Sequence, residues 1–184
     1  MTLKNLLGIR LDAVTPDKAL VAKLLAAAQR NIADAQLRGL GAENRFSAAY
    51  KAVMQLAMVA LHANGFRTLT SKPGHHPTAI QTLPTSVGLP PAQAIVLDAL
   101  RKQRKLADDS GDLIPDSAAL ECLASAMDLL AVQSRAGLAQ GSPAGFDLTD
   151  WGGCAAWLRF TATAHASIAS ISSGNSSYSP GCMR

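Results

Sequence analysis

Apolar residues recur at helical spacing over long stretches of this chain, and breaker residues separate the stretches. The first helix is expected to begin near Thr15, with Pro16 at its first helical position, and to stop at Gly39. The second is expected over residues 42–63 and is expected to end before Gly65. Few charges interrupt this second helix, which predicts that it is buried on most sides.

The following part of the chain is broken more often by proline and glycine. Residues 66–74 are expected to form a loop, and residues 77–82 a short helix. Two more long helices are expected over residues 91–107 and from residue 115 to just before Gly137, with a polar turn at residues 108–112 between them. The predicted apolar faces of these two helices include Ile95, Leu106 and Leu120.

Long helices with short connections predict an all-α fold, an antiparallel bundle of four to five helices. The composition agrees, because 48% of the residues are hydrophobic but only 4% are aromatic, whereas a β-sandwich is rich in aromatic and β-branched residues. No apolar run is long enough to span a membrane, and the N-terminus lacks the apolar core of a signal peptide. The sequence therefore predicts a cytoplasmic protein with no membrane partner.

The character of the chain changes near residue 140. Residues 1–140 carry the whole formal net charge of +4 and form the predicted bundle domain. Residues 141–184 are low in charge and rich in Ser and Gly, so they bury too little apolar surface to offset the entropy lost on ordering. A poorly ordered tail is predicted there, with one weak helix over residues 151–171.

Most sequence signatures of enzymes are missing from the chain. It has no GxGxxG, P-loop, GxSxG or HExxH motif. Its three cysteines, Cys122, Cys154 and Cys182, lie far apart and form no CxxC pair, so neither a zinc site nor a disulfide framework is predicted. No metal and no cofactor are expected.

The strongest candidate for chemistry is a basic cluster at residues 101–105, where two arginines and two lysines lie at a predicted helix end. One interpretation is structural, because cations stabilise a helix C-terminus and here have Asp98 and Asp108 at pairing distance along the helix. The other is a phosphate-binding site, because a guanidinium group holds phosphate in a bidentate way. The predicted nucleic-acid contacts are then Arg45, Arg67, Lys72 and Lys105.

Two adjacent histidines, His75 and His76, follow the predicted loop. Each is a candidate acid, base or phosphate ligand, because imidazole titrates near neutral pH. The alternative is a packing or capping role. Their adjacency predicts side chains that diverge.

Four sequence motifs together resemble a group of small bacterial proteins of the HEPN (higher eukaryotes and prokaryotes nucleotide-binding) superfamily. The motifs lie at residues 45–50, 65–67, 74–76 and 97–104, and the resemblance covers residues 1–140. It implies a helical bundle that dimerises, and metal-independent ribonuclease activity in toxin–antitoxin, phage-defence or CRISPR-associated systems. It also implies a nucleotidyltransferase-type partner protein.

The resemblance further implies a catalytic arginine followed by a histidine a few residues later. Arg104 matches the arginine, with Arg101 as second choice, and Asp109 lies with Asp108 where the histidine or a tyrosine is expected. RNA cleavage without a metal needs a group that moves the proton of the 2′-hydroxyl, and arginine supplies only stabilisation of charge. The remaining catalytic candidates are His75 and His76.

Three functions are therefore open as hypotheses. The first is an RNA- or nucleotide-binding protein of a toxin–antitoxin or phage-defence module, which includes metal-independent ribonuclease activity. The second is a non-catalytic helical adaptor, antitoxin or inhibitor that acts by protein–protein binding. The third is non-specific DNA binding driven by basic charge, which ranks last because the net charge is only +4.

Overall fold

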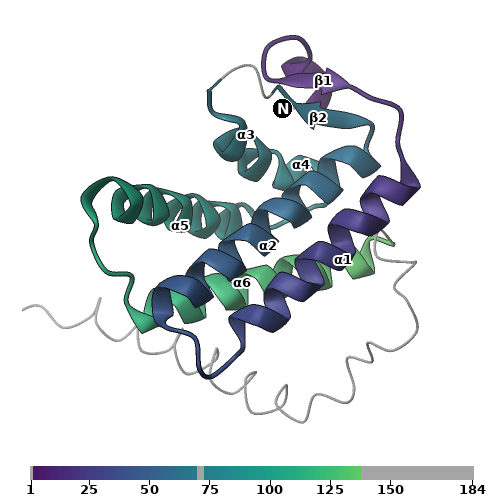
Figure 1. Ribbon diagram of the computed structural model, residues 1–184. Helices are drawn as coiled ribbons and strands as arrows, with labels where there is room; N and C mark the ends of the chain where they lie inside the picture. The colour runs from purple at the N-terminus through teal and green to yellow at the C-terminus, as the bar shows by residue number, and fades with distance from the viewer. Residues whose placement is uncertain (1, 70–72, 138–184) are drawn as a thin grey trace, which may run out of the picture. The chain divides into compact units, whose positions relative to one another are not determined.

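The computed structural model describes residues 2–69 and 73–137, and Figure 1 shows their arrangement. The predicted tail at residues 141–184, with its helix over 151–171, lies outside this part of the chain. In order, the described elements are η1 (Leu3–Leu6), β1 (Leu11–Ala13), α1 (Lys18–Ala35), α2 (Ala42–Ala63), β2 (Phe66–Thr68), α3 (His75–Gln81), α4 (Leu83–Ser86), α5 (Pro91–Ser110) and α6 (Asp116–Arg135).

The predicted helical bundle is confirmed, and α2 lies at its centre. α1 and α6 pack along α2, and α1 runs antiparallel to it (Figure 1). α5 packs chiefly against α3 and the neighbouring α6 rather than along α2. None of the helices in the described residues is long and apolar enough to cross a membrane.

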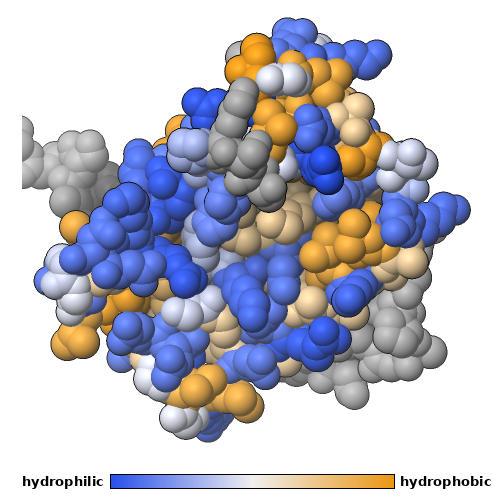
Figure 2. Space-filling model, turned by 45° about the horizontal axis from the view of Figure 1, so that its top comes forward, coloured by the Kyte–Doolittle hydropathy of each residue, from blue (hydrophilic) through white to orange (hydrophobic). Residues whose placement is uncertain are grey.

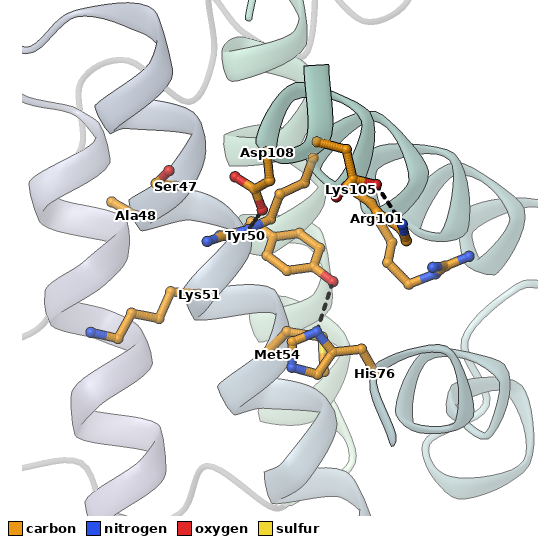
Figure 3. Close-up of a pocket in the computed structure, with 11 residues that line it drawn as sticks. Ser47, Ala48, Tyr50, Lys51, Met54, His76, Arg101, Lys105 and Asp108 are labelled. Atoms are coloured by element: carbon orange, nitrogen blue, oxygen red, sulfur yellow. Dashed lines mark hydrogen bonds and ion pairs between the residues drawn. The ribbon is translucent and has the colours of Figure 1, made fainter. Parts of the chain in front are cut away.

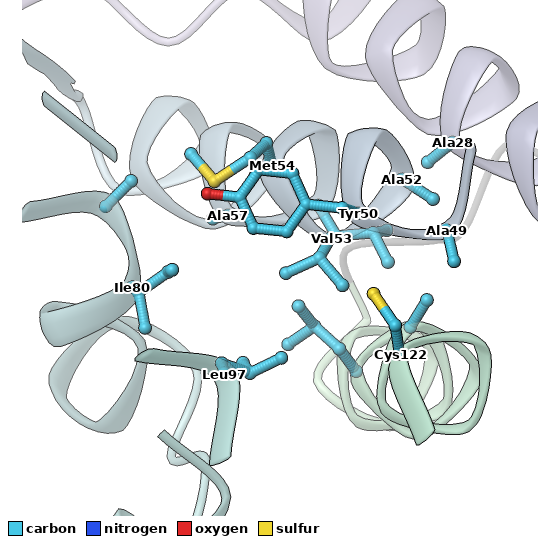
Figure 4. Close-up of a cluster of buried hydrophobic side chains, with 14 of the residues drawn as sticks. Ala28, Ala49, Tyr50, Ala52, Val53, Met54, Ala57, Ile80, Leu97 and Cys122 are labelled. Atoms are coloured by element: carbon cyan, nitrogen blue, oxygen red, sulfur yellow. The ribbon is translucent and has the colours of Figure 1, made fainter. Parts of the chain in front are cut away.

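The core is built around α2, whose predicted burial is also confirmed. Figure 4 shows Ala28 of α1 beside Ala52 of α2, while Ile80 and Leu97 approach α2 from another side. Small side chains let helix axes approach closely, so alanine-rich faces produce a dense core with few aromatic residues. The buried residues of α2 are Phe46, Ala49, Tyr50, Ala52, Val53, Met54, Leu56, Ala57, Val59, Ala60 and Leu61.

The limits of α1 differ from the prediction, which placed the helix start at Thr15. Asp17 is the N-cap, because its carboxylate accepts hydrogen bonds from the backbone amides of Ala19 (2.8 Å) and Leu20 (3.2 Å). A carboxylate at this position also opposes the positive end of the helix dipole. α1 ends at Ala35, before the predicted stop at Gly39.

The end of α5 also differs from the prediction, because residues 108–110 are helical and do not form a turn. Asp108 and Asp109 pair with cations four residues earlier on α5, and the Ser110 hydroxyl donates to the Leu106 carbonyl oxygen at 2.8 Å. These contacts extend the helix until Gly111, which adopts the left-handed conformation (φ 74°) that glycine tolerates best.

Three apolar residues that were expected to be buried are exposed. Ile95 is 71% exposed, Leu106 61% and Leu120 53%. α5 lies at the margin of the bundle and buries only a narrow face that includes Leu97 and Leu100. Figure 2 shows that the face in view is mainly hydrophilic, with separate hydrophobic patches, so no continuous apolar surface covers it.

A strand of a short two-stranded antiparallel sheet replaces part of the loop predicted at residues 66–74. β1 and β2 pair antiparallel, with Leu11 opposite Thr68 and Asp12 opposite Arg67. Strands of three residues have no periodicity to detect and form only because a distant segment pairs with them. The predicted short helix at 77–82 is also corrected, since α3 begins at His75 and α4 follows it directly.

Candidate functional site

A cleft of about 740 Å³ lies between α2 and α5, and the start of α3 contributes to its wall. Figure 3 shows its side chains. Nine residues were predicted as catalytic or nucleic-acid contacts, and five of them line this cleft, namely His76, Arg101, Arg104, Lys105 and Asp109. Three of the four cations of the basic cluster thus share one concave surface with one of the two imidazoles.

Helical spacing explains why these side chains meet. On α5, Arg101, Arg104, Lys105 and Asp108 follow one another at intervals that place them on one face of the helix. On α2, the residues at positions 47, 50, 51 and 54 line the opposite wall for the same reason. The two main walls of the cleft are therefore formed by one face of α2 and one face of α5 rather than by a loop.

Tyr50 forms the floor of the cleft and is only 3% exposed. The Arg104 guanidinium lies over its ring, 5.0 Å from the ring centroid, in a cation–π contact. On the same helix, the Phe46 ring is parallel to that of Tyr50 at 6.3 Å. Burial raises the pKa of the Tyr50 phenol to about 12, so the phenol keeps its proton at neutral pH. Tyr50 thereby fixes the place of Arg104 in the cleft.

His76, in the first turn of α3, contacts the Tyr50 side chain. Its Nδ1 lies 3.4 Å from the Tyr50 hydroxyl oxygen, and a dashed line marks this contact in Figure 3. Burial lowers the pKa of His76 below the ordinary 6.5, and the nearby His75, Arg104 and Arg101 act in the same direction. The imidazole is therefore neutral at neutral pH. If Nδ1 accepts the phenol proton, Nε2–H is a donor, and in the other tautomer Nε2 is a free base.

The cations of α5 are paired with carboxylates of the same helix. Arg101 Nε lies 2.8 Å from Asp98, and Arg104 Nε lies 3.5 Å from Asp108. The Arg101 hydrogen bond is the main cause that lowers the pKa of Asp98. The structural interpretation of the basic cluster is thus confirmed in its geometry. The two lysines are paired as well, Lys102 with Asp98 at 3.0 Å and Lys105 with Asp109.

The lining residues that were not selected from the sequence include Tyr50 and Lys51. Lys51 has no ion pair among the described residues, and it adds an unpaired charge to the wall formed by α2. The signal for Lys51 was its place as the last charge before the uncharged part of α2. Tyr50 had no such signal, because a tyrosine on an apolar helix face is typical of a core.

Three of the other four predicted site residues do not line the cleft. Arg45 pairs with Asp116 at the start of α6, and Arg67 of β2 pairs with Asp12 of β1 at 3.3 Å. His75 lines a second cavity, and Lys72 lies outside the described residues. Charge of the right sign at a nearby sequence position does not bring a side chain to the same surface.

The expectation that His75 and His76 diverge is wrong. Their rings meet edge to face, with centroids 4.4 Å apart and an interplanar angle of 78°. Both residues lie in the first turn of α3, where the backbone brings the two rings into contact. The pair therefore separates the cleft, which His76 lines, from the second cavity.

Within the part of the chain that the structure describes, no group of three or more His, Cys, Asp or Glu side chains is arranged to hold a metal ion. Comparisons with protein-family models, with curated proteins and with solved structures found no match to this chain. The resemblance to the HEPN superfamily therefore stays a prediction from the sequence motifs.

Proposed function

We propose that the cleft between α2 and α5 binds phosphate groups of RNA or of a nucleotide. The observation that carries the proposal is the convergence of Arg101, Arg104 and the neutral His76 on one water-accessible cleft. Guanidinium groups and an imidazole N–H are the donors that phosphate oxygens accept best. Lys51, which has no ion pair among the described residues, adds charge on the opposite wall.

Phosphate binding at this cleft requires that the phosphate replace a carboxylate as the partner of an arginine. Arg104 is held by Asp108 at 3.5 Å, which is longer than a strong charge-assisted hydrogen bond. A phosphate offers more acceptor oxygens and more negative charge than a carboxylate, and so it displaces Asp108 from Arg104. The ring of Tyr50 stays in contact with the guanidinium group and limits the entropy that Arg104 loses on binding.

The cleft provides no stacking platform for a base, because the Tyr50 ring is almost fully buried and lies beneath Arg104. Base stacking on aromatic side chains is the usual source of base preference in single-strand binding. The proposed ligand is therefore recognised through its phosphates, with little dependence on base identity.

The experiment measures binding of a fluorescent oligouridylate by the full chain and by Arg104→Ala at low salt. We expect Arg104→Ala to lower the affinity about tenfold to a hundredfold, because a hydrogen bond between charged groups contributes about 1.5–3 kcal/mol. The matched control is Arg30→Ala, which removes one exposed cation from α1. Equal affinity of the wild-type protein and Arg104→Ala would overturn the proposal, and a deoxy-oligonucleotide distinguishes RNA from DNA.

Cleavage of RNA without a metal is a second candidate function, favoured by the position of His76 beside Arg104 and Tyr50. In this reaction the 2′-oxygen attacks the adjacent phosphorus, a cyclic phosphate forms, and the 5′-oxygen of the next nucleotide leaves. His76 takes the proton of the 2′-hydroxyl in the tautomer with a free Nε2, and the leaving oxygen takes a proton from water. Arg101 and Arg104 stabilise the charge of the phosphorane.

Cleavage is tested with labelled RNA in the presence of a metal chelator. His76→Gln and Arg104→Ala are expected to abolish cleavage, while His62→Gln, which changes a histidine of α2 that does not line the cleft, is expected to retain it. Cleavage that continues unchanged in His76→Gln excludes the imidazole from the reaction. A place in a toxin–antitoxin or phage-defence module, a homodimer and a nucleotidyltransferase-type partner stay predictions from the family resemblance.

A further inference from the structure

A second cavity, of about 310 Å³, lies between the start of α3 and the residues that flank β1 and β2. Arg10 and His75 line it, together with Gly74, Thr78 and three apolar or proline side chains. Neither the basic cluster of α5 nor the Tyr50 floor takes part in it. β2 lies next to α3 in Figure 1, and the turn before β1 reaches the same cavity from a distant part of the sequence.

Backbone hydrogen bonds fix Arg10 at the edge of this cavity. Its amide donates to the Leu6 carbonyl oxygen at 2.9 Å, and its carbonyl oxygen accepts from the Leu69 amide at 3.0 Å. Arg10 has no ion pair among the described residues. The turn before β1 thus places beside α3 a guanidinium group that has no ion pair among the described residues.

Gly74 is the residue that allows this approach. It has φ 95°, a conformation that side-chain-bearing residues rarely adopt, and a Cβ atom there would lie 3.0 Å from Arg10 Nη1. A larger residue would strain the backbone and push the guanidinium group away. Glycine is therefore the residue best suited to position 74, where the Arg10 guanidinium group lies close to the start of α3.

The charge of this cavity differs from that of the cleft. In the cleft, Asp108 and Asp109 pair with cations, whereas no Asp or Glu of the described residues lines the second cavity. A guanidinium group with no ion pair among the described residues and an imidazole that line the same cavity favour an anion there.

The two hollows meet at the histidine pair. His76 lines the cleft, His75 lines the second cavity, and their rings are 4.4 Å apart. We propose that Arg10 and His75 form a second phosphate subsite, which holds the phosphate next to the one in the cleft along the same nucleic-acid strand. This inference rests on the proposed function of the cleft.

The test compares uridine monophosphate with the dinucleotide pUpU, which carries a second phosphate, by calorimetric titration of the full chain. The wild-type protein is expected to bind pUpU more tightly than the mononucleotide. Arg10→Ala is expected to lower the affinity for pUpU about tenfold and to leave the mononucleotide unaffected, because only pUpU reaches Arg10. Gly74→Ala is expected to act in the same direction, and Arg30→Ala is the charge-matched control.

The outcomes separate this inference from the proposed function. If Arg104→Ala loses both ligands but Arg10→Ala binds pUpU as the wild type does, the second subsite is wrong and the cleft stands. If Arg10→Ala weakens both ligands equally, the subsite is also wrong, because the effect is then one of general charge. If neither ligand binds the wild-type protein, the proposed function and the subsite both fail.

Discussion

Two sides of α2 differ in their surroundings, because one side packs against neighbouring helices and the other lines the cleft. On the side of α1 and α6, small residues such as Ala49 and Ala52 let the helices approach closely and exclude water. On the side of α5, Tyr50, Lys51 and Met54 line an open cleft instead. One helix therefore carries both the core and one wall of the candidate site, with a change of residue size and polarity around its circumference.

This difference separates stability from binding. Most contacts on the packed side are apolar and buried, so removal of a large side chain there leaves a cavity. Contacts on the open side are ion pairs that solvent reaches, and exposed pairs contribute little to folding. Substitutions on the packed side are thus expected to change folding, and those on the open side to change ligand affinity.

The largest effect is expected from Leu56→Ala, which cuts a side chain with no exposed surface on the packed side of α2. We expect a loss of about 2–5 kcal/mol in the free energy of unfolding, because the substitution removes apolar contacts and leaves a cavity. Urea denaturation measures this loss. Leu106→Ala, at an exposed leucine, is the control and is expected to stay within about 0.5 kcal/mol of the wild type. Equal losses of unfolding free energy in both variants would contradict the expected difference between the packed side of α2 and exposed positions.

A smaller effect is expected from Asp108→Asn, which frees Arg104 from its partner on the open side. The affinity for an oligouridylate is expected to rise by about threefold, in line with the ~0.2–1 kcal/mol of an exposed ion pair. Fluorescence anisotropy at constant salt measures the change. The control is Asp34→Asn, which removes one exposed carboxylate from α1. An equal rise in both variants indicates a general charge effect rather than competition within the cleft.

The smallest effect is expected from the protonation of His76. Its pKa in the folded chain lies below the ordinary 6.5, so the unfolded chain takes up the proton first as the pH falls. The stability that the neutral imidazole contributes is therefore complete above pH 6.5 and decreases as the pH falls below it. Thermal unfolding as a function of pH is expected to depend less on pH in His76→Gln than in the wild type.

His62 titrates in the same direction, because its burial also lowers its pKa. The variant His62→Gln therefore gives the comparison that isolates the share of His76. An increase of stability on acidification through this range, in the wild type, would contradict the expected sign.

The sequence predicted those parts of the fold that depend on local signals. The bounds of α2, and those of α6 to within a residue or two, match the expectation, because capping and breaker residues mark both ends of each helix. The two-stranded sheet was not predicted, because β1 and β2 each have three residues and are specified by pairing across more than fifty positions. Pairing of this kind leaves no pattern within either segment.

The residues of the candidate site also fall into those that local sequence signals could identify and those that they could not. The basic cluster could be found because its residues are close in sequence, and helical geometry then placed them together. Arg45 was expected to join it, but it points to α6, where Asp116 compensates its charge. Tyr50 could not be selected, because its role beneath Arg104 depends on how α5 lies over α2. Contacts between helices are a property of packing that no single segment encodes.

The extra helical turn at the end of α5 has a consequence for the way the protein responds to its medium. Asp108 and Asp109 lie on the same helix as the basic residues, and they neutralise part of its positive charge through ion pairs with Arg104 and Lys105. An incoming polyanion then trades places with carboxylates and releases fewer dissolved ions than it would at a bare patch. If the cleft binds phosphate as proposed, we expect weak adsorption to bulk nucleic acid, so that the fit of a ligand to the cleft matters more than its charge alone.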